Sequence, residues 1–156
     1  MTAAEPVSDT RGVHGFVGGC LCGAVRFGSR VDASFALHCC CVDCRKSSGT
    51  GHGTHVVVRR DEFAVTGTVT LYERAADSGN VVTRAFCGEC GSPVYSTNSG
   101  KPDVVYPRAS ALDEPDRIRP QMILYASRAP SWDVMPAAIP AFDTLPDPSR
   151  AAPETT

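Results

Sequence analysis

Hydrophobic and polar residues alternate over short stretches of this chain, and the alternation predicts β-strands. In the clearest case Val69 and Leu71 alternate with Thr68, Thr70 and Tyr72, so that one face of the strand is apolar. Similar runs of β-branched and aromatic residues recur at the spacing typical of an all-β domain. The predicted strands are Ala24–Phe27, Phe35–Cys39, Thr54–Val58, Phe63–Val65, Val69–Tyr72, Val81–Phe86, Val94–Ser96, Val104–Tyr106 and Met122–Tyr125.

Helices are expected to be short. In the first half of the chain the sequence predicts a single helical turn over Cys44–Ser48, which Asp43 could cap. The 14 glycines and 12 prolines among 156 residues favour turns over long helices. A chain of this length can bury one core of its own. We therefore predict one mainly β domain with short helical turns.

The two ends of the chain differ from its middle. Residues 1–13 have no apolar segment after a basic start, which argues against a signal peptide, and no later stretch is apolar enough to span a bilayer. The other end carries Pro146, Pro148 and Pro153 among small polar residues. We predict a flexible arm over residues 1–13, a folded domain over 14–143 and a flexible tail over 144–156.

The overall charge narrows the choice of partners. Lys and Arg number 15 and Asp and Glu 17, which gives a formal net charge of −2. This balance does not indicate nucleic acid or an anionic membrane as a partner. We expect a cytoplasmic monomer or homodimer that acts on small molecules. In a reducing cytoplasm, clustered cysteines bind metal more often than they form disulfides.

Four cysteines lie close together in the first half of the chain, at Cys39, Cys40, Cys41 and Cys44. On an extended segment Cys39 and Cys41 point to one face while Cys40 points to the other, although a bulge could turn Cys40 inward. The two residues before Cys44 suit a tight turn that brings two sulfurs onto one metal ion. Three thiolates would leave an open position on Zn²⁺, as in catalytic sites. Buried free cysteines are the alternative.

A second set of cysteines is split along the chain, with Cys20 and Cys22 near its start and Cys87 and Cys90 much later. Alternation on a strand would place the first two on one face, and the later two have the spacing of a metal-binding knuckle. Together they predict a closed Cys₄ zinc site that contributes on the order of 10 kcal/mol to folding. Two disulfides are the alternative.

A few other residues are candidates for a functional role. Arg45 and Lys46 follow the last cysteine of the first set and could bind the carboxylates of an anionic thiol, or be solvated surface charges. His52 and His55 could reach the zinc of the open three-thiolate site or relay a proton, or occupy polar positions of a loop or sheet. Trp132 is expected in the core or in a pocket wall.

These cysteine motifs resemble those of the glutathione-dependent formaldehyde-activating enzymes and the related centromere protein V group. The likeness covers roughly residues 15–143 and is carried by residues 19–27, 38–49, 84–93, 111–115, 126–132 and 139–142. The chain departs from the family at two positions, where Cys40 and Met122 replace histidines that are common in its members. The resemblance implies a zinc-binding β fold of the Mss4-like type. It also implies that one zinc is structural, on Cys20, Cys22, Cys87 and Cys90, and the other catalytic, on Cys39, Cys41 and Cys44.

The function predicted from these features is that of a zinc-dependent, carbon–sulfur lyase-type enzyme acting on a thiol–aldehyde adduct, similar to S-(hydroxymethyl)glutathione synthase. It would hold two Zn²⁺ ions per chain and use glutathione or a similar thiol as cosubstrate. Two other classes remain open. One is a non-catalytic zinc scaffold that binds protein or nucleic acid, and the other is a redox or metal sensor that uses Cys40.

Overall fold

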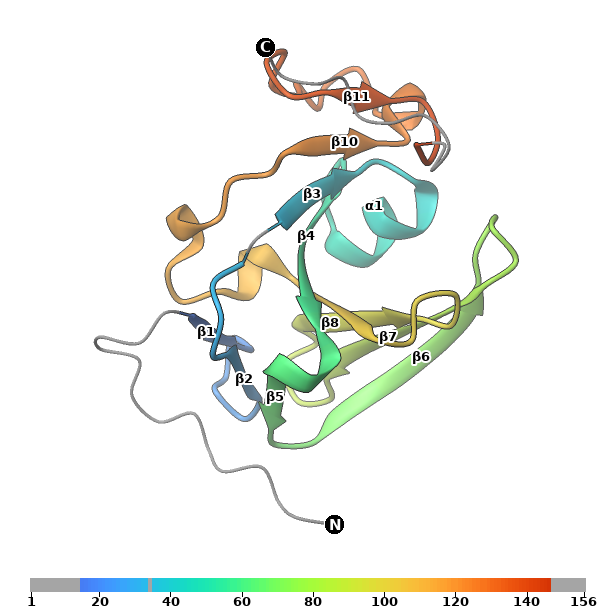
Figure 1. The fold of residues 1–156 in the computed structure, drawn as a ribbon. Coiled ribbons are helices and arrows are strands. Elements are labelled where there is room, and N and C mark those ends of the chain that lie inside the picture. The colour runs from blue at the N-terminus through green and yellow to red at the C-terminus, as the bar shows by residue number, and fades with distance from the viewer. Residues whose placement is uncertain (1–14, 34, 147–156) are drawn as a thin grey trace.

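The computed structural model describes residues 15–33 and 35–146 (Figure 1). The arm predicted over residues 1–13 lies outside the described residues, as does the predicted tail from residue 147 onwards. The strands are β1 (Phe16–Gly19), β2 (Arg26–Ser29), β3 (Phe35–Cys39), β4 (Gly53–Arg59), β5 (Phe63–Thr66), β6 (Val69–Ala75), β7 (Val81–Cys87), β8 (Pro93–Asn98), β9 (Val104–Pro107), β10 (Met122–Leu124) and β11 (Ala141–Phe142). The helix is α1 (Val42–Ser48), and single 3₁₀ turns are η1 (Arg60–Glu62), η2 (Ala109–Ala111), η3 (Pro115–Arg117) and η4 (Ala126–Arg128).

Within the described residues the strands form two sheets. A 3-stranded sheet has the order β1-β2-β5, and an 8-stranded sheet has the order β11-β10-β3-β4-β9-β8-β7-β6. In Figure 1, β3, β10 and β11 lie at one end of the large sheet and β6, β7 and β8 at the other, with α1 in the space between them. The helix therefore faces both halves of the large sheet, and its N-terminus follows directly from β3.

The mainly β fold with short helical turns is confirmed. Every predicted strand is present, with ends shifted by up to a few residues, while β1 and β11 were not predicted. β1 escapes prediction because two of its four residues are glycines, which strand propensity disfavours. Gly18 is needed for packing, since a Cβ atom there would lie 2.3 Å from the carbonyl oxygen of Ala111. β11 has only two residues.

The helix begins earlier than predicted, and its cap is a different residue. Cys41 is the N-cap of α1, with its sulfur accepting from the N–H of Cys44, so the predicted cap by Asp43 is wrong. Asp43 lies in the first turn and forms ion pairs with Arg74 and Arg84 of the large sheet. A carboxylate in the first helical turn is also favoured by the helix dipole. These contacts fix α1 against β6 and β7.

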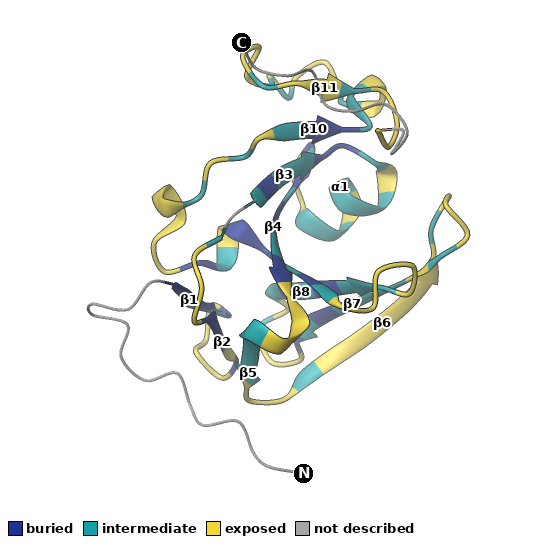
Figure 2. Ribbon diagram, viewed as in Figure 1, coloured by how far each residue is buried: buried dark blue, intermediate teal, exposed yellow. Residues whose placement is uncertain are grey.

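The core joins the small sheet to one part of the large sheet, as the buried segments of Figure 2 indicate. Its apolar cluster includes Phe27 of β2, Val56 of β4 and Val94 of β8, together with Cys20 and Cys87. Two cysteines of the split set are therefore part of the core. No helix among the described residues is long and apolar enough to cross a membrane.

Candidate metal centres and an adjoining pocket

Two groups of cysteine sulfurs converge in the described part of the chain. Within each group the sulfurs all lie within 4.8 Å of one another, and no histidine nitrogen or carboxylate oxygen of the described residues joins either group at that distance. The four-cysteine group consists of Cys20, Cys22, Cys87 and Cys90, and the three-cysteine group of Cys39, Cys41 and Cys44. All of these cysteines are free rather than disulfide-bonded. Both sets of thiols fit a thiophilic metal such as zinc.

The four-cysteine group joins two tight turns that have similar backbones. In the first turn the N–H of Gly23 donates to the carbonyl of Cys20 at 3.1 Å, and in the second the N–H of Gly91 donates to that of Cys87 at 2.9 Å. Both glycines have positive φ angles, 79° and 74°, which residues with a Cβ adopt at a cost. The first pair of cysteines thus lies in a turn between β1 and β2, and the prediction that it shares the face of a strand is wrong.

Hydrogen bonds favour the thiolate form at Cys20 and Cys90, whereas the contact with the sulfur of Cys20 raises the pKa of Cys22 to about 12. Contacts with the side chain and the backbone N–H of Ser92 lower the pKa of Cys90 to about 5. The N–H of Val25 donates to the sulfur of Cys20 at 3.2 Å. Such N–H donors stabilise negative charge on sulfur and so suit metal-bound thiolates. Cys20 and Cys87 belong to the core cluster, whereas Cys22 is exposed, and the four sulfurs together are enough to fill the coordination of a tetrahedral metal ion.

The three-cysteine group is built where β3 passes into α1. Cys39 ends β3, Cys41 caps α1, and Cys44 lies in the first turn of the helix. Hydrogen bonds from the thiols of Cys39 and Cys44 lower the pKa of Cys41 to about 2, and backbone N–H groups of the helix assist. The hydrogen bond to the Cys41 sulfur in turn raises the pKa of Cys39. Without a metal ion, the negative charge of the group therefore lies on Cys41. Metal binding would displace the remaining thiol protons.

Cys40 lies outside both groups, in agreement with the predicted alternation of side chains. It is fully buried, and its N–H donates to the carbonyl of Leu124 at 2.9 Å. That bond continues the parallel pairing of β10 with β3, in which Leu124 lies opposite Cys39. Burial raises the pKa of the Cys40 thiol. The sheet thus holds this sulfur away from the other three.

A buried arginine and a buried histidine adjoin the three-cysteine group. His55 Nε2 lies 3.5 Å from the sulfur of Cys44. Arg108 Nη1 contacts the same Nε2 atom at 3.3 Å, and Arg108 Nη2 donates to the hydroxyl of Ser47 at 2.8 Å. Arg108 is only 3% exposed. Burial and the positive charge of Arg108 lower the pKa of His55 to about 3, so the imidazole is neutral.

Gly53 leaves the space in which Arg108 and His55 meet beside Cys44. A Cβ atom at position 53 would lie 2.6 Å from Arg108 Nη1, 2.8 Å from His55 Nε2 and 3.3 Å from the Cβ of Cys44. Any side chain there would therefore displace the arginine, the histidine or the helix. The glycine at the start of β4 permits a close approach of three elements, which is one use of glycine in a strand.

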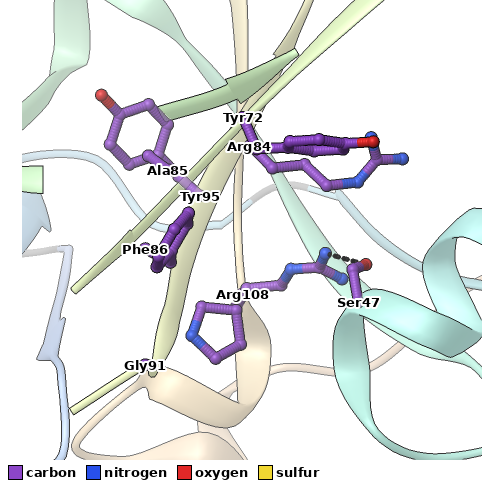
Figure 3. Close-up of a pocket in the computed structure, with 9 residues that line it drawn as sticks. Ser47, Tyr72, Arg84, Ala85, Phe86, Gly91, Tyr95 and Arg108 are labelled. Atoms are coloured by element: carbon purple, nitrogen blue, oxygen red, sulfur yellow. Dashed lines mark hydrogen bonds between the residues drawn. The ribbon is translucent and has the colours of Figure 1, made fainter. Parts of the chain in front are cut away.

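A pocket of about 210 Å³ lies between α1 and the large sheet (Figure 3). In Figure 3 the guanidinium groups of Arg84 and Arg108 reach into the same space, and Arg108 bonds to Ser47 of α1. Arg84 donates to Asp43 at 3.4 Å. The lining residues are Ser47, Tyr72, Arg84, Ala85, Phe86, Gly91, Pro93, Tyr95 and Arg108. The pocket shares Arg108 with the surroundings of the three-cysteine group, so the two are adjacent.

The remaining sequence candidates lie in α1, just before β4, and between η4 and β11. Arg45 is half-buried, with Nε buried and without a partner among the described residues, whereas Lys46 is exposed. Neither lines the pocket, and their role in binding a carboxylate stays a prediction. His52 Nδ1 lies 2.7 Å from a carboxylate oxygen of Asp133. Trp132 is 70% exposed, so its predicted place in the core or a pocket wall is wrong.

Sequence reasoning missed Arg108 and Arg84. Arg108 stands 53 residues from His55 in the chain and approaches it through an isolated bridge beside the pairing of β4 with β9. Local sequence carries no signal for a contact of this range. In the sequence, a single arginine after an apolar strand is interpreted as an exposed surface charge. The burial of Arg108 becomes visible only in the folded structure.

Elemental analysis should find two zinc ions per chain in protein purified under reducing conditions. The reason is that the two groups supply separate sets of converging thiols. A count of free thiols after metal removal under denaturing conditions is the matched measurement. A metal-free protein whose thiols are paired as disulfides would contradict this prediction.

Comparison with known proteins places this arrangement in a wider group. Residues 15–128 match the family described as glutathione-dependent formaldehyde-activating enzyme. A curated protein of Halomonas elongata, named provisionally as such an enzyme, is 31% identical over 122 residues, which cover 74% of this chain and 77% of the relative. A crystal structure of a Rhodobacter sphaeroides protein has a similar fold, with a TM-score of 0.50 and 22% identity, covering 62% of this chain and 87% of the other.

Proposed function

The chain belongs to the glutathione-dependent formaldehyde-activating enzyme family, and on that premise we propose that it is a zinc-dependent enzyme of the carbon–sulfur lyase type. Its substrates would be a thiol, glutathione or a close analogue, and a small aldehyde such as formaldehyde. The reaction joins them to a hemithioacetal or releases them from it. This makes the aldehyde available as a thiol adduct.

The observation that carries the proposal is the three-cysteine group. Cys39, Cys41 and Cys44 offer three sulfurs within 4.8 Å of one another, and no further His, Asp or Glu ligand atom of the described residues completes the set. Zinc sites with three protein ligands are typical of catalysis, whereas closed sets of four are structural. A zinc ion held there would lower the pKa of an added thiol and so supply thiolate at neutral pH.

The pocket beside this group supports an anionic thiol as substrate. Arg84 pairs with Asp43, which Arg74 also approaches at 3.5 Å, so two cations share one carboxylate. Arg108 donates to neutral groups, Ser47 and His55. Arg84 and Arg108 both line the pocket, and of the two only Arg84 pairs with a carboxylate of the described residues. Guanidinium groups bind carboxylates through paired hydrogen bonds. A thiol with a carboxylate a few bonds from its sulfur would place both groups at once.

The reaction needs no oxidant or reductant. The sulfur forms a bond to the carbonyl carbon, the π bond of the carbonyl breaks, and its electron pair remains on oxygen. The thiol proton is lost to solvent, and the oxygen takes up a proton, so the adduct contains all atoms of thiol and aldehyde. The role of the chain is to hold the thiolate and the carboxylate in fixed positions, which removes much of the entropic cost of bringing two molecules together.

Exchange NMR with glutathione and formaldehyde tests the proposal. The wild-type protein should increase the rate of exchange between free glutathione and its hydroxymethyl adduct, which also form spontaneously. Cys41→Ala removes one thiol of the three-cysteine group and should reduce exchange to the uncatalysed rate, whereas Cys40→Ser should retain activity because Cys40 lies outside the group. Equal rates with and without wild-type protein would refute the proposal for these substrates.

A further inference from the structure

His55 is placed almost as a fourth ligand of the three-cysteine group. Two donors on one tetrahedral zinc lie roughly 3.5 Å apart, given the usual Zn–S and Zn–N bond lengths. The separation between His55 Nε2 and the sulfur of Cys44 is 3.5 Å. The imidazole is nevertheless not part of the group, because no histidine nitrogen of the described residues lies within 4.8 Å of all three sulfurs. His55 thus stands beside the site on the side of Cys44.

The contact with Arg108 occupies the nitrogen that would bind a metal. A guanidinium has only donors, so His55 Nε2 must be the acceptor at 3.3 Å. The neutral ring then carries its proton on Nδ1, which is the buried atom without a partner among the described residues. An imidazole nitrogen has one lone pair in the plane of the ring, and a lone pair that accepts from Arg108 cannot also bind a metal.

Arg108 is itself held in place. It is 3% exposed, its second nitrogen donates to Ser47 of α1 at 2.8 Å, and Gly53 leaves the space that its head group fills. A buried charge with fixed partners keeps its orientation better than an exposed side chain. The same arginine lines the pocket, so the group that holds His55 also faces the space in which the proposed substrate would bind.

We infer that Arg108 is a positioning residue that holds His55 away from the three-cysteine site and keeps the fourth coordination position free for a thiol. The inference rests on the proposed function, since it assumes a metal at this site. Without Arg108, His55 would turn toward the sulfurs and close the site as a Cys₃His centre. Closed sites of that composition are structural rather than catalytic.

The test is ¹¹³Cd NMR of protein loaded with cadmium and labelled with ¹⁵N in its histidine rings. The two sites give separate resonances, so the four-cysteine group reports on the fold. In the wild type neither resonance should couple to a histidine nitrogen. In Arg108→Met the resonance of the three-cysteine group should shift and gain a coupling to His55. Arg108→Lys, which retains a donor, should resemble the wild type.

Thiol binding supplies the second readout. An uncharged thiol, 2-mercaptoethanol, is used so that loss of a carboxylate contact has no influence. It should shift the three-cysteine resonance of the wild type, bind about ten- to a hundredfold more weakly to Arg108→Met, and bind again to Arg108→Met combined with His55→Gln. A merely structural role of Arg108 would not produce the histidine coupling or this rescue.

The outcomes separate the inference from the function on which it rests. If the wild type binds no second cadmium ion or no thiol, the proposed function fails. If the wild type responds to thiol and Arg108→Met responds equally, without histidine coupling, the inference is overturned. If Arg108→Met does not fold, the wild-type ¹⁵N spectrum decides. A His55 proton on Nδ1 with Nε2 free of metal supports the inference, and a metal-coupled Nε2 overturns it.

Discussion

Cys87→Ala is expected to unfold the protein, whereas Cys41→Ala should leave it folded with one metal ion fewer. Cys87 is 1% exposed and belongs to the same apolar cluster as Phe27 and Val94. Its four-cysteine group fastens the turn between β1 and β2 to the turn between β7 and β8. Structural zinc sites contribute on the order of 10 kcal/mol to folding, against a total stability of roughly 5–15 kcal/mol for a domain.

Cys41 has a different place in the fold. It is partly exposed and caps a helix of seven residues. Loss of an N-cap costs about 1 kcal/mol, which most domains tolerate. The three-cysteine group lies at the junction of β3 and α1, outside the main apolar cluster. Loss of the Cys41 thiol should therefore abolish metal binding at the three-cysteine site and leave the strands intact.

Circular dichroism during denaturant unfolding, combined with metal analysis, tests this pair of variants. The expected result is that Cys87→Ala is insoluble or lacks a cooperative transition, while Cys41→Ala unfolds cooperatively near the wild-type midpoint and retains one zinc ion. Cys40→Ser is the matched control for the loss of a thiol in a buried position. Similar destabilisation by Cys87→Ala and Cys41→Ala would contradict the division into a structural and a catalytic site.

Cysteine spacing was enough to predict which thiols meet. Both groups of sulfurs contain the residues that their spacing suggested, even where the local structure was misjudged. Cys20 and Cys22 were expected on a strand, and they lie in a turn that Gly23 permits through its φ of 79°. A spacing of two residues brings two sulfurs to one side in either case. The prediction of convergence was thus less sensitive to backbone conformation than the prediction of the strand.

Features that depend on contacts distant in sequence could not be predicted in this way. Asp43 was expected to cap α1 because short acidic residues favour that position, but the sulfur of Cys41 takes it and Asp43 pairs with Arg84 of β7. The burial of Arg108 beside His55 depends on the order of strands in the large sheet. Trp132 was expected in the core or in a pocket wall, but it is 70% exposed, and a single exposed aromatic residue breaks no physical rule.

A small thiol should bind directly to the metal of the three-cysteine site. Three sulfurs converge there, Cys40 is held in the sheet by the bond of its N–H to Leu124, and His55 accepts from Arg108. One coordination position of a tetrahedral ion is then left for an outside ligand. Binding should strengthen as pH rises toward the pKa of the free thiol, because the thiolate is the form that binds.

The most direct measurement is the absorption spectrum of the cobalt-substituted protein during a titration with glutathione. The ligand-field bands and the sulfur-to-cobalt charge-transfer bands should change saturably as a fourth sulfur binds, and Cys40→Ser should give the same response as the wild type. A wild-type spectrum that glutathione leaves unchanged, together with a Cys40→Ser spectrum that responds, would show that Cys40 is the fourth ligand and that the three-cysteine site is closed.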